Sequence, residues 1–257
     1  RPIVDGDGGI SKAVVEDSEK GVICAINPWL GMQEDDTVTV FLDAVTVFDH
    51  TVLADEVDKR LFFFVEAERF VPGWIEECYY LLHRKGETAP DDPSVKLRLR
   101  VKFDLPGGPD KEPHLPWHSE LGIVQLPDEV IEQGVDAEWA AKGVPMTIAR
   151  YPAIALRDTV QVKWGSVFLK PFVLEQEHVD GTVPIVVRAE QADILAAGDS
   201  NGLPVHYELY DEVWNLSEKW SERTTVGVDA GAWRLDAPII KQSVNGVIDL
   251  KELNQQD

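Results

Sequence analysis

The chain has 257 residues, with 46 acidic and 24 basic side chains, so its formal net charge at pH 7 is −22. A surface this negative repels phosphate backbones and anionic lipids, which argues against nucleic-acid binding and membrane insertion. The apolar share of 44% suffices for packed cores, but no apolar run approaches the roughly 18 residues of a membrane-spanning helix. Because the first residue is Arg and no leader follows, we expect a mature or excised piece of a longer protein.

An internal repeat organises the chain. Residues 20–68 align without a gap with residues 142–190, where average composition predicts about 3 identities by chance. The alignment has 14, at positions 20, 21, 22, 26, 36, 37, 38, 40, 45, 57, 58, 65, 67 and 68 of the first copy. Most other pairs keep their character, as Trp29 and Tyr151 do. A repeat of this period indicates two modules of ordinary domain length.

Alternating apolar residues predict the same series of β-strands in both copies. The expected strands are 22–26, 37–42, 45–47, 61–65, 77–83 and 95–101, matched by 144–148, 159–164, 167–169, 183–187, 204–210 and 224–228. Val38 and Val160 should point into equivalent cores, and Pro184 places its strand at a sheet edge. The only helical signal, a weak one, lies at 128–142. About seven short strands per copy predict antiparallel β-sandwiches.

These signals give an all-β chain of two tandem sandwiches. We expect module 1 at residues 1–105, a Pro/Gly linker at 106–114 and module 2 at 115–236. The linker composition is typical of a hinged, semi-stiff joint. Residues 237–257 repeat the opening pattern of the other copies, Pro followed by Gly and then Ile or Val, and so predict the start of a further module or a C-terminal strand segment.

The two cysteines, Cys24 and Cys78, both lie in the first copy. Their counterparts, Met146 and Val205, are apolar, which indicates that both positions face a core. Two alternatives stay open: a pair of buried thiols, or a disulfide that joins an early strand to a late one, which an exporting compartment would permit. The wide spacing and the missing third ligand argue against a metal or redox site.

A calcium loop is the nearest approach to a metal motif. Asp5, Asp7 and Glu16 occupy its first, third and twelfth positions, but Ile10 stands where the loop requires Gly. The opening segments at 115–123 and 237–247 carry no matching set of carboxylates. We therefore expect no cofactor, with calcium at these three residues as a weak alternative.

Signatures of catalysis are missing from the sequence. It contains no phosphate-binding loop, dinucleotide fingerprint or CxxC pair. His114 and His118 have the spacing of a helical metal pair, yet Pro116 between them disfavours a helix. Ser119 beside His118 does not form a triad, because triads assemble from distant positions around an oxyanion site. The prediction is that the chain is not an enzyme.

Four aromatic residues of the second copy have no full counterpart in the first: Tyr207, Tyr210, Trp214 and Trp220. They alternate with carboxylates and amides, a composition that can stack on a sugar or anchor a protein partner. The alternative interpretation is that the two tryptophans close one end of the sandwich. The sequence leaves both open.

The Asp-Thr-Val-x-Val motif at 36–40 and 158–162, the alternating strands and the repeated opener resemble bacterial immunoglobulin-like (Ig-like) repeats. These are tandem modules of very large surface and adhesin-type proteins of Gram-negative bacteria. The resemblance implies sandwiches strung head to tail outside the cytoplasm, on the bacterial cell surface, and it brings no catalytic residues. Expected partners are neighbouring repeat modules of the same chain.

The function that follows from the resemblance is a spacer or adhesive stalk. The alternative is a carbohydrate- or receptor-binding module that uses residues 207–220 to contact a host glycan or protein.

Overall fold

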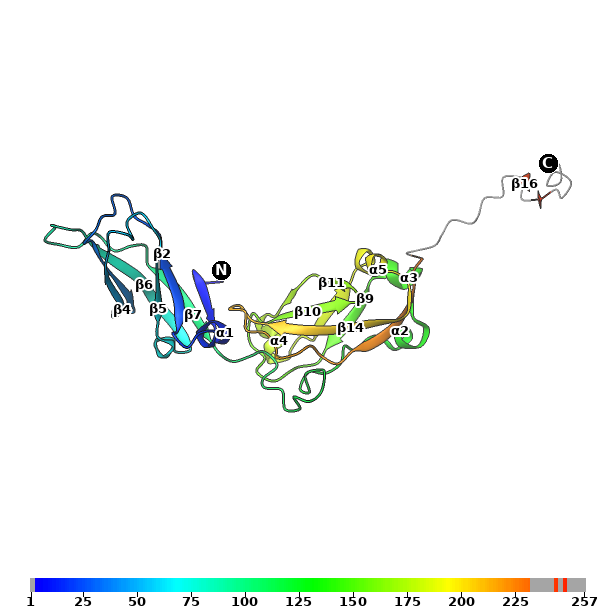
Figure 1. Ribbon diagram of the computed structural model, residues 1–257. Helices are drawn as coiled ribbons and strands as arrows, with labels where there is room; N and C mark the ends of the chain where they lie inside the picture. Colours follow the sequence, from blue (N-terminus) through cyan, green and yellow to red (C-terminus); the bar gives the residue numbers. More distant parts are fainter. Residues whose placement is uncertain (1–2, 232–242, 245–246, 249–257) are drawn as a thin grey trace.

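The computed structural model describes residues 3–231 and the short strands β16 (Ser243–Val244) and β17 (Val247–Ile248). The prediction of a third module at 237–257 therefore falls largely outside the described residues. Within 3–231 the chain is mostly β, with two groups of strands that lie end to end (Figure 1). We refer to the strands within 8–102 as the N-terminal sandwich and those within 135–229 as the C-terminal sandwich.

Each sandwich consists of two sheets, and the strand order is the same in both. The N-terminal sheets have the orders β1-β7-β6-β3-β4 and β2-β5, and the C-terminal sheets β8-β15-β14-β10-β11 and β9-β13, with β12 added on β10. In each sandwich the two-stranded sheet, β2-β5 or β9-β13, thus faces the larger sheet, which is an Ig-like arrangement. The all-β sandwich prediction is confirmed.

The N-terminal strands are β1 (Gly8–Ser11), β2 (Val22–Ile26), β3 (Thr37–Leu42), β4 (Val45–Thr51), β5 (Leu61–Val65), β6 (Gly73–His83) and β7 (Leu97–Lys102). The C-terminal strands are β8 (Val135–Asp136), β9 (Val144–Ile148), β10 (Thr159–Trp164), β11 (Val167–Phe168), β12 (Phe172–Val173), β13 (Ile185–Ala189), β14 (Ser200–Tyr210) and β15 (Thr224–Asp229). Pro184 immediately precedes β13, which pairs only with β9 in the described chain, so its predicted place at a sheet edge is confirmed.

Period-two alternation sets the register of the central strands. Val38 of β3 pairs with Leu82, and Val160 of β10 pairs with Leu209. Both valines are 0% exposed. The two halves therefore bury equivalent residues, as the repeat predicts. Each half nevertheless has its own hydrophobic cluster, and the two clusters share no residue.

Short helices are more numerous than the sequence indicates. The signal at 128–142 is confirmed as α2 (Asp128–Gln133) and α3 (Ala137–Lys142), but α1 (Lys12–Glu16), α4 (Gln176–Asp180) and α5 (Gln191–Ala197) were not predicted. Each spans too few residues for hydrophobic periodicity to show. Caps define them instead: Ser11 Oγ accepts from Val14 N, and Glu190 and Asp193 form a capping box at α5.

The predicted Pro/Gly linker is packed at its start and mostly exposed over 109–114. Residues 106–108 are buried against the C-terminal sandwich. Gly107 N donates to Pro152 O at 3.0 Å, and the His118 ring lies 3.2 Å from Gly108 O. Gly107 has a φ of +91° and a Cβ there would lie 3.1 Å from Leu121, so only glycine suits this turn. Pro and Gly here shape a packed turn. Composition alone does not show which surface such a segment packs on.

Candidate functional site

A polar joint connects the two sandwiches. It is built by the loop 211–217, which follows β14 and lies against the ends of β1 and β7. Asp211 is 1% exposed, and its Oδ2 lies 3.1 Å from Lys102 Nζ. Asn215 donates to Asp211 Oδ2 at 3.0 Å and to Lys102 O at 2.9 Å, and its Oδ1 accepts from Lys12 N at 2.9 Å. One buried amide thus hydrogen-bonds both sandwiches.

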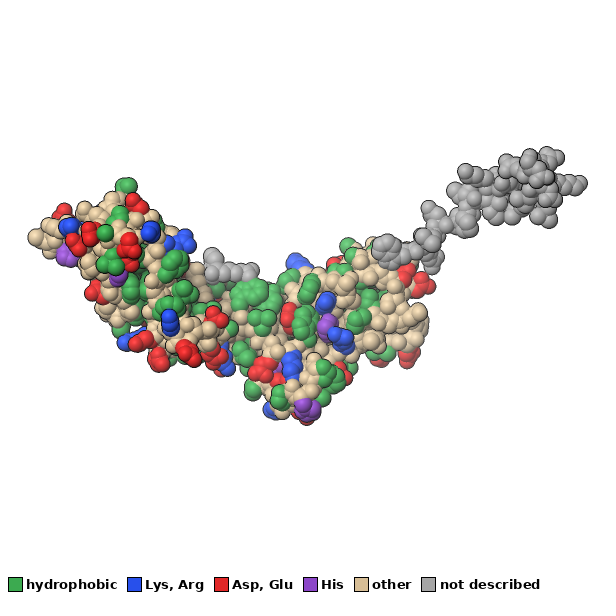
Figure 2. All heavy atoms as spheres, viewed as in Figure 1, with side chains coloured by type: hydrophobic (Ala, Val, Ile, Leu, Met, Phe, Trp, Pro, Cys, Tyr) green, Lys and Arg blue, Asp and Glu red, His purple; other side chains and the backbone are tan. Residues whose placement is uncertain are grey.

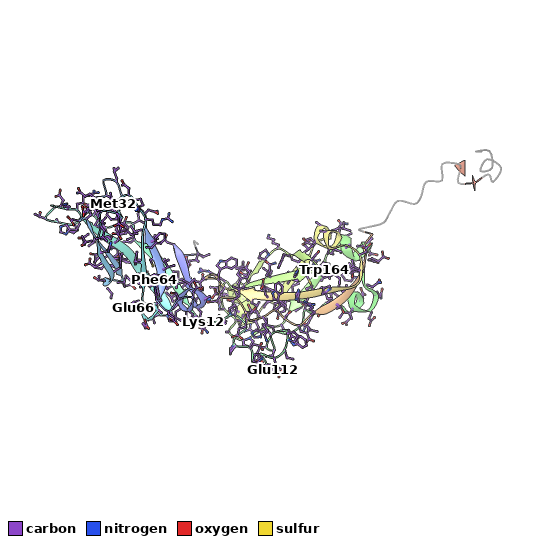
Figure 3. The ribbon with its side chains drawn as sticks, in the orientation of Figure 1. Lys12, Met32, Phe64, Glu66, Glu112 and Trp164 are labelled. Carbon is purple, nitrogen blue, oxygen red and sulfur yellow. The ribbon has the colours of Figure 1, made fainter. Side chains whose placement is uncertain are left out.

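Two further contacts flank this centre. The Arg157 guanidinium lies 2.6 Å from Asp5 Oδ2 and 3.2 Å from Glu212 Oε2, so it bridges the two halves. Val213 packs on Gly9, where an added Cβ would lie 2.6 Å from the valine side chain. Lys12, labelled in Figure 3, marks the place where the sandwiches meet. The joint combines buried hydrogen bonds, ion pairs and a close backbone approach.

The aspartates of the repeated motif are structural acceptors. Asp158 Oδ2 accepts from the Tyr151 hydroxyl at 3.2 Å and from Ala155 N at 2.9 Å. Burial raises the pKa of Asp158 from 3.8 to about 6. Its counterpart Asp36 behaves in the opposite sense: although burial acts to raise its pKa, hydrogen bonds from Lys85 N, Trp29 Nε1 and Gln33 N lower it.

The three candidate calcium ligands do not converge. Asp5 pairs with Arg157 across the joint. Asp7 Oδ2 accepts from Arg98 N at 2.7 Å, and Glu16 lies 3.9 Å from Lys12. Among the described residues no group of three His, Cys, Asp or Glu side chains is placed to hold a metal ion.

The four candidate aromatic residues occupy three different environments. Tyr207 is 0% exposed and belongs to the core, at the position that Tyr80 takes in the N-terminal sandwich. Tyr210 stacks on Trp214, with ring centroids 4.7 Å apart. Trp220 lies apart from them and packs on His206 at 4.5 Å. The structure therefore does not bring the four residues together, because strand alternation turns Tyr207 inward.

Trp220 opens onto an aromatic groove of about 740 Å³. Its lining comprises Pro116, Trp117, Lys163, His206, Glu218, Lys219, Trp220, Ser221, Glu222 and Arg223. Burial, with the charges of Arg223 and Lys163, lowers the pKa of His206. Lys163 and His206 are cross-strand partners, so the strand register could have identified them. Trp117 comes from the segment after the linker, and no local signal places it here.

The two cysteines are free thiols on facing sheets, and both are half-buried. Cys24 lies on β2 and Cys78 on β6, and both line a second cavity, of about 620 Å³, in the N-terminal sandwich. The sequence left open a pair of thiols or a disulfide, and in the structure the two cysteines are not bonded to each other. The pKa of Cys24 is raised to about 11, mainly by burial and to a smaller extent by the nearby Cys78 thiol.

Comparison with known proteins gives distant structural likenesses. No protein-family model matches the chain, and no curated protein does. Two solved structures are similar over most of its length. One is described as structural insight into host cell surface retention of a 1.5-MDa bacterial ice-binding adhesin, with 16% identity, 86% of this chain and 61% of that chain covered, and a TM-score of 0.32. The other contains the FN1–FN3 domains of chicken CNTN1, with 11% identity, coverages of 89% and 64%, and a TM-score of 0.29.

The chain spans about three fifths of the length of these two structures. At such TM-scores the likenesses carry no argument about function. In the part of the chain that the structure describes, no helix is long and apolar enough to cross a membrane.

Proposed function

We propose that this chain is a non-enzymatic pair of tandem Ig-like modules that acts as a stiff spacer or adhesive stalk in an extracellular bacterial repeat protein. Module 1 spans residues 1–105 and module 2 spans 115–236, joined by 106–114. The neighbouring modules of such an array are its principal partners. A spacer has to transmit position, so the property that matters is how firmly one module fixes the next.

The joint is the observation that supports this proposal. Asp211 and Asn215 are 1% and 2% exposed, and they hydrogen-bond backbone and side-chain groups of the other sandwich. A buried polar group that loses its partner costs about 1–3 kcal/mol, so bending the joint open is unfavourable. Residues 106–108 of the linker, which are buried against the C-terminal sandwich, add a second constraint. Acidic side chains are distributed over both sandwiches on the face shown in Figure 2, and the net charge of −22 keeps neighbouring stalks apart.

Small-angle X-ray scattering of the chain and of an Asp211→Ala/Asn215→Ala variant tests the proposal. We expect a single extended particle for the parent chain and a broader distribution of maximum dimensions for the variant. A Glu19→Ala/Glu222→Ala variant, which alters two exposed carboxylates outside the joint, should scatter like the parent. Equal flexibility in all three proteins would contradict the stiff spacer.

The aromatic groove supports a second candidate function, the binding of a host glycan or protein. Trp220, Trp117 and His206 provide ring faces on which a sugar can stack, and Lys163, Arg223 and Glu222 surround them with donors and acceptors. A glycan array separates the two functions. Trp220→Ala should abolish any specific signal, whereas Trp214→Ala, outside the groove, should leave it intact. If the parent chain gives no signal, this second function is ruled out for the glycans tested.

A further inference from the structure

In the C-terminal sandwich an extended segment closes the gap between the two sheets. Gln125 and Thr147 of β9 exchange two backbone hydrogen bonds, at 3.0 and 2.9 Å. Thr224 at the start of β15 donates to Val124 O at 2.9 Å. The side chains that this segment buries are Leu121, Val124 and Leu126, with exposures of 3, 1 and 7%. The segment 121–126 thus lies across the edge between β9 and β15 and completes the core.

The corresponding edge of the N-terminal sandwich, between β2 and β7, carries no such segment within the described residues. There β2 pairs only with β5. Residues 3–7 keep to the side of β7, where Asp7 N donates to Arg98 O at 2.8 Å. We call this open edge the seam. Here the two sandwiches, otherwise alike in strand order, differ in how their core is closed.

The seam leads into the cavity of about 620 Å³ that contains both cysteines. Its lining is mainly apolar and includes Val22, Cys24, Trp29, Val40, Phe63 and Leu99. Two positions that are fully buried in the C-terminal sandwich are partly exposed at the equivalent places in the N-terminal sandwich. Met146 and Tyr207 are 0% exposed, whereas their counterparts Cys24 and Tyr80 are only half-buried. Val95, at the rim, is 82% exposed.

An unpaired strand edge beside an apolar cavity has the two features of a strand-addition site. The backbone of the edge provides hydrogen bonds, and the cavity accepts every second side chain of an added strand. We propose that the seam is a docking site for one extended polypeptide segment with apolar side chains at alternate positions, held against β2 as residues 121–126 are held against β9. The added segment would pair with Ala25 of β2, which is the counterpart of Thr147.

The chemistry favours a polypeptide over the other occupants. A small apolar molecule can fill the cavity but leaves the backbone of the β2 edge unpaired. A second copy of this chain has to bring two surfaces together when each chain carries a net charge of −22, which opposes self-association. A strand of the composition Leu-Gly-Ile-Val-Gln-Leu, as at 121–126, satisfies both the edge and the cavity.

The test uses the full chain and a synthetic peptide with the sequence of residues 119–127. The chain has only two cysteines, and both line the cavity, so their rate of labelling by a thiol reagent reports on the seam alone. At a peptide concentration about ten times its Kd, labelling should slow about tenfold, because only the unbound fraction reacts. The same peptide carrying Val124→Asp and Leu126→Asp should give no protection.

A variant of the chain tests whether the peptide pairs with the free edge of β2. Ala25→Pro removes one donor from β2 and is compatible with an edge strand, as Pro145 in β9 shows. This variant should keep its circular dichroism spectrum and lose protection by the peptide. Three results would overturn the proposal: equal protection by the parent and doubly substituted peptides, protection by an apolar dye but not by the peptide, or concentration-dependent protection without peptide, which assigns the seam to a second copy.

Discussion

At the scale of single residues, the repeated aspartate has opposite energetic roles in the two sandwiches. Asp158 is buried with a pKa of about 6, whereas hydrogen bonds lower the pKa of Asp36. A carboxyl group whose pKa is higher in the folded protein binds its proton more tightly when folded. Its contribution to stability is complete below about pH 4 and is lost as the pH rises through about 6.

We predict that Asp158→Asn removes this pH dependence. The parent chain should lose about 3 kcal/mol of unfolding free energy in the C-terminal sandwich between about pH 3 and pH 7, from the shift between 3.8 and about 6. The variant should lose far less, because an amide does not titrate in this range. It should still fold, because a single amide oxygen can accept both bonds that Asp158 Oδ2 accepts. Urea titrations at stepped pH measure the difference, and identical pH profiles would refute the assignment.

Asp36→Asn is the matched substitution, and we expect it to destabilise the N-terminal sandwich. Both carboxylate oxygens accept: Oδ2 from Trp29 and Gln33, and Oδ1 from Lys85 N. An amide turns one acceptor into a donor that faces another donor, at a cost of about 1–3 kcal/mol. A shift of the urea midpoint at pH 7 checks this, and an unchanged midpoint speaks against it.

At the scale of elements, the joint depends on the close approach of β1 and the loop 211–217. Gly9→Ala would place a Cβ 2.6 Å from the Val213 side chain. We predict that this variant uncouples the two sandwiches without unfolding either one. Nuclear magnetic relaxation should then give each half a shorter rotational correlation time than in the parent chain.

A second substitution shows whether the effect is steric. Val213→Gly in the Gly9→Ala background removes the clashing side chain and should bring the two correlation times back together in part. Residues in contact couple in this way, whereas independent sites add. Correlation times that stay those of a rigid particle in Gly9→Ala would mean that this contact does not hold the joint.

Strand positions are the elements that the sequence predicts best. Alternation along 37–42 and 159–164 is a local property that needs no knowledge of partners, and β3 and β10 occupy these ranges. The joint lies beyond such reasoning, since Asn215 and Lys102 O are 113 positions apart. Tyr207 is an intermediate case: its neighbouring carboxylates suggested a surface position, whereas its register on β14, opposite Val162, places it in the core.

At the scale of the whole molecule, two cores without a shared residue predict two unfolding steps. The N-terminal sandwich should unfold at the lower temperature, because its open seam leaves apolar residues exposed. Calorimetry should show two transitions, and thiol labelling, which reports only on Cys24 and Cys78, should follow the first. One transition seen identically by both methods would contradict separate cores.

The central claim is that a buried polar joint fixes one sandwich relative to the other. Pulsed electron spin resonance tests it most directly, with spin labels at Glu68→Cys and Glu177→Cys, both exposed, in a Cys24→Ala/Cys78→Ala background. We predict a narrow distance distribution that broadens when Asp211→Ala and Asn215→Ala are added. A distribution that is already broad with the joint intact, and unchanged by its removal, would contradict it.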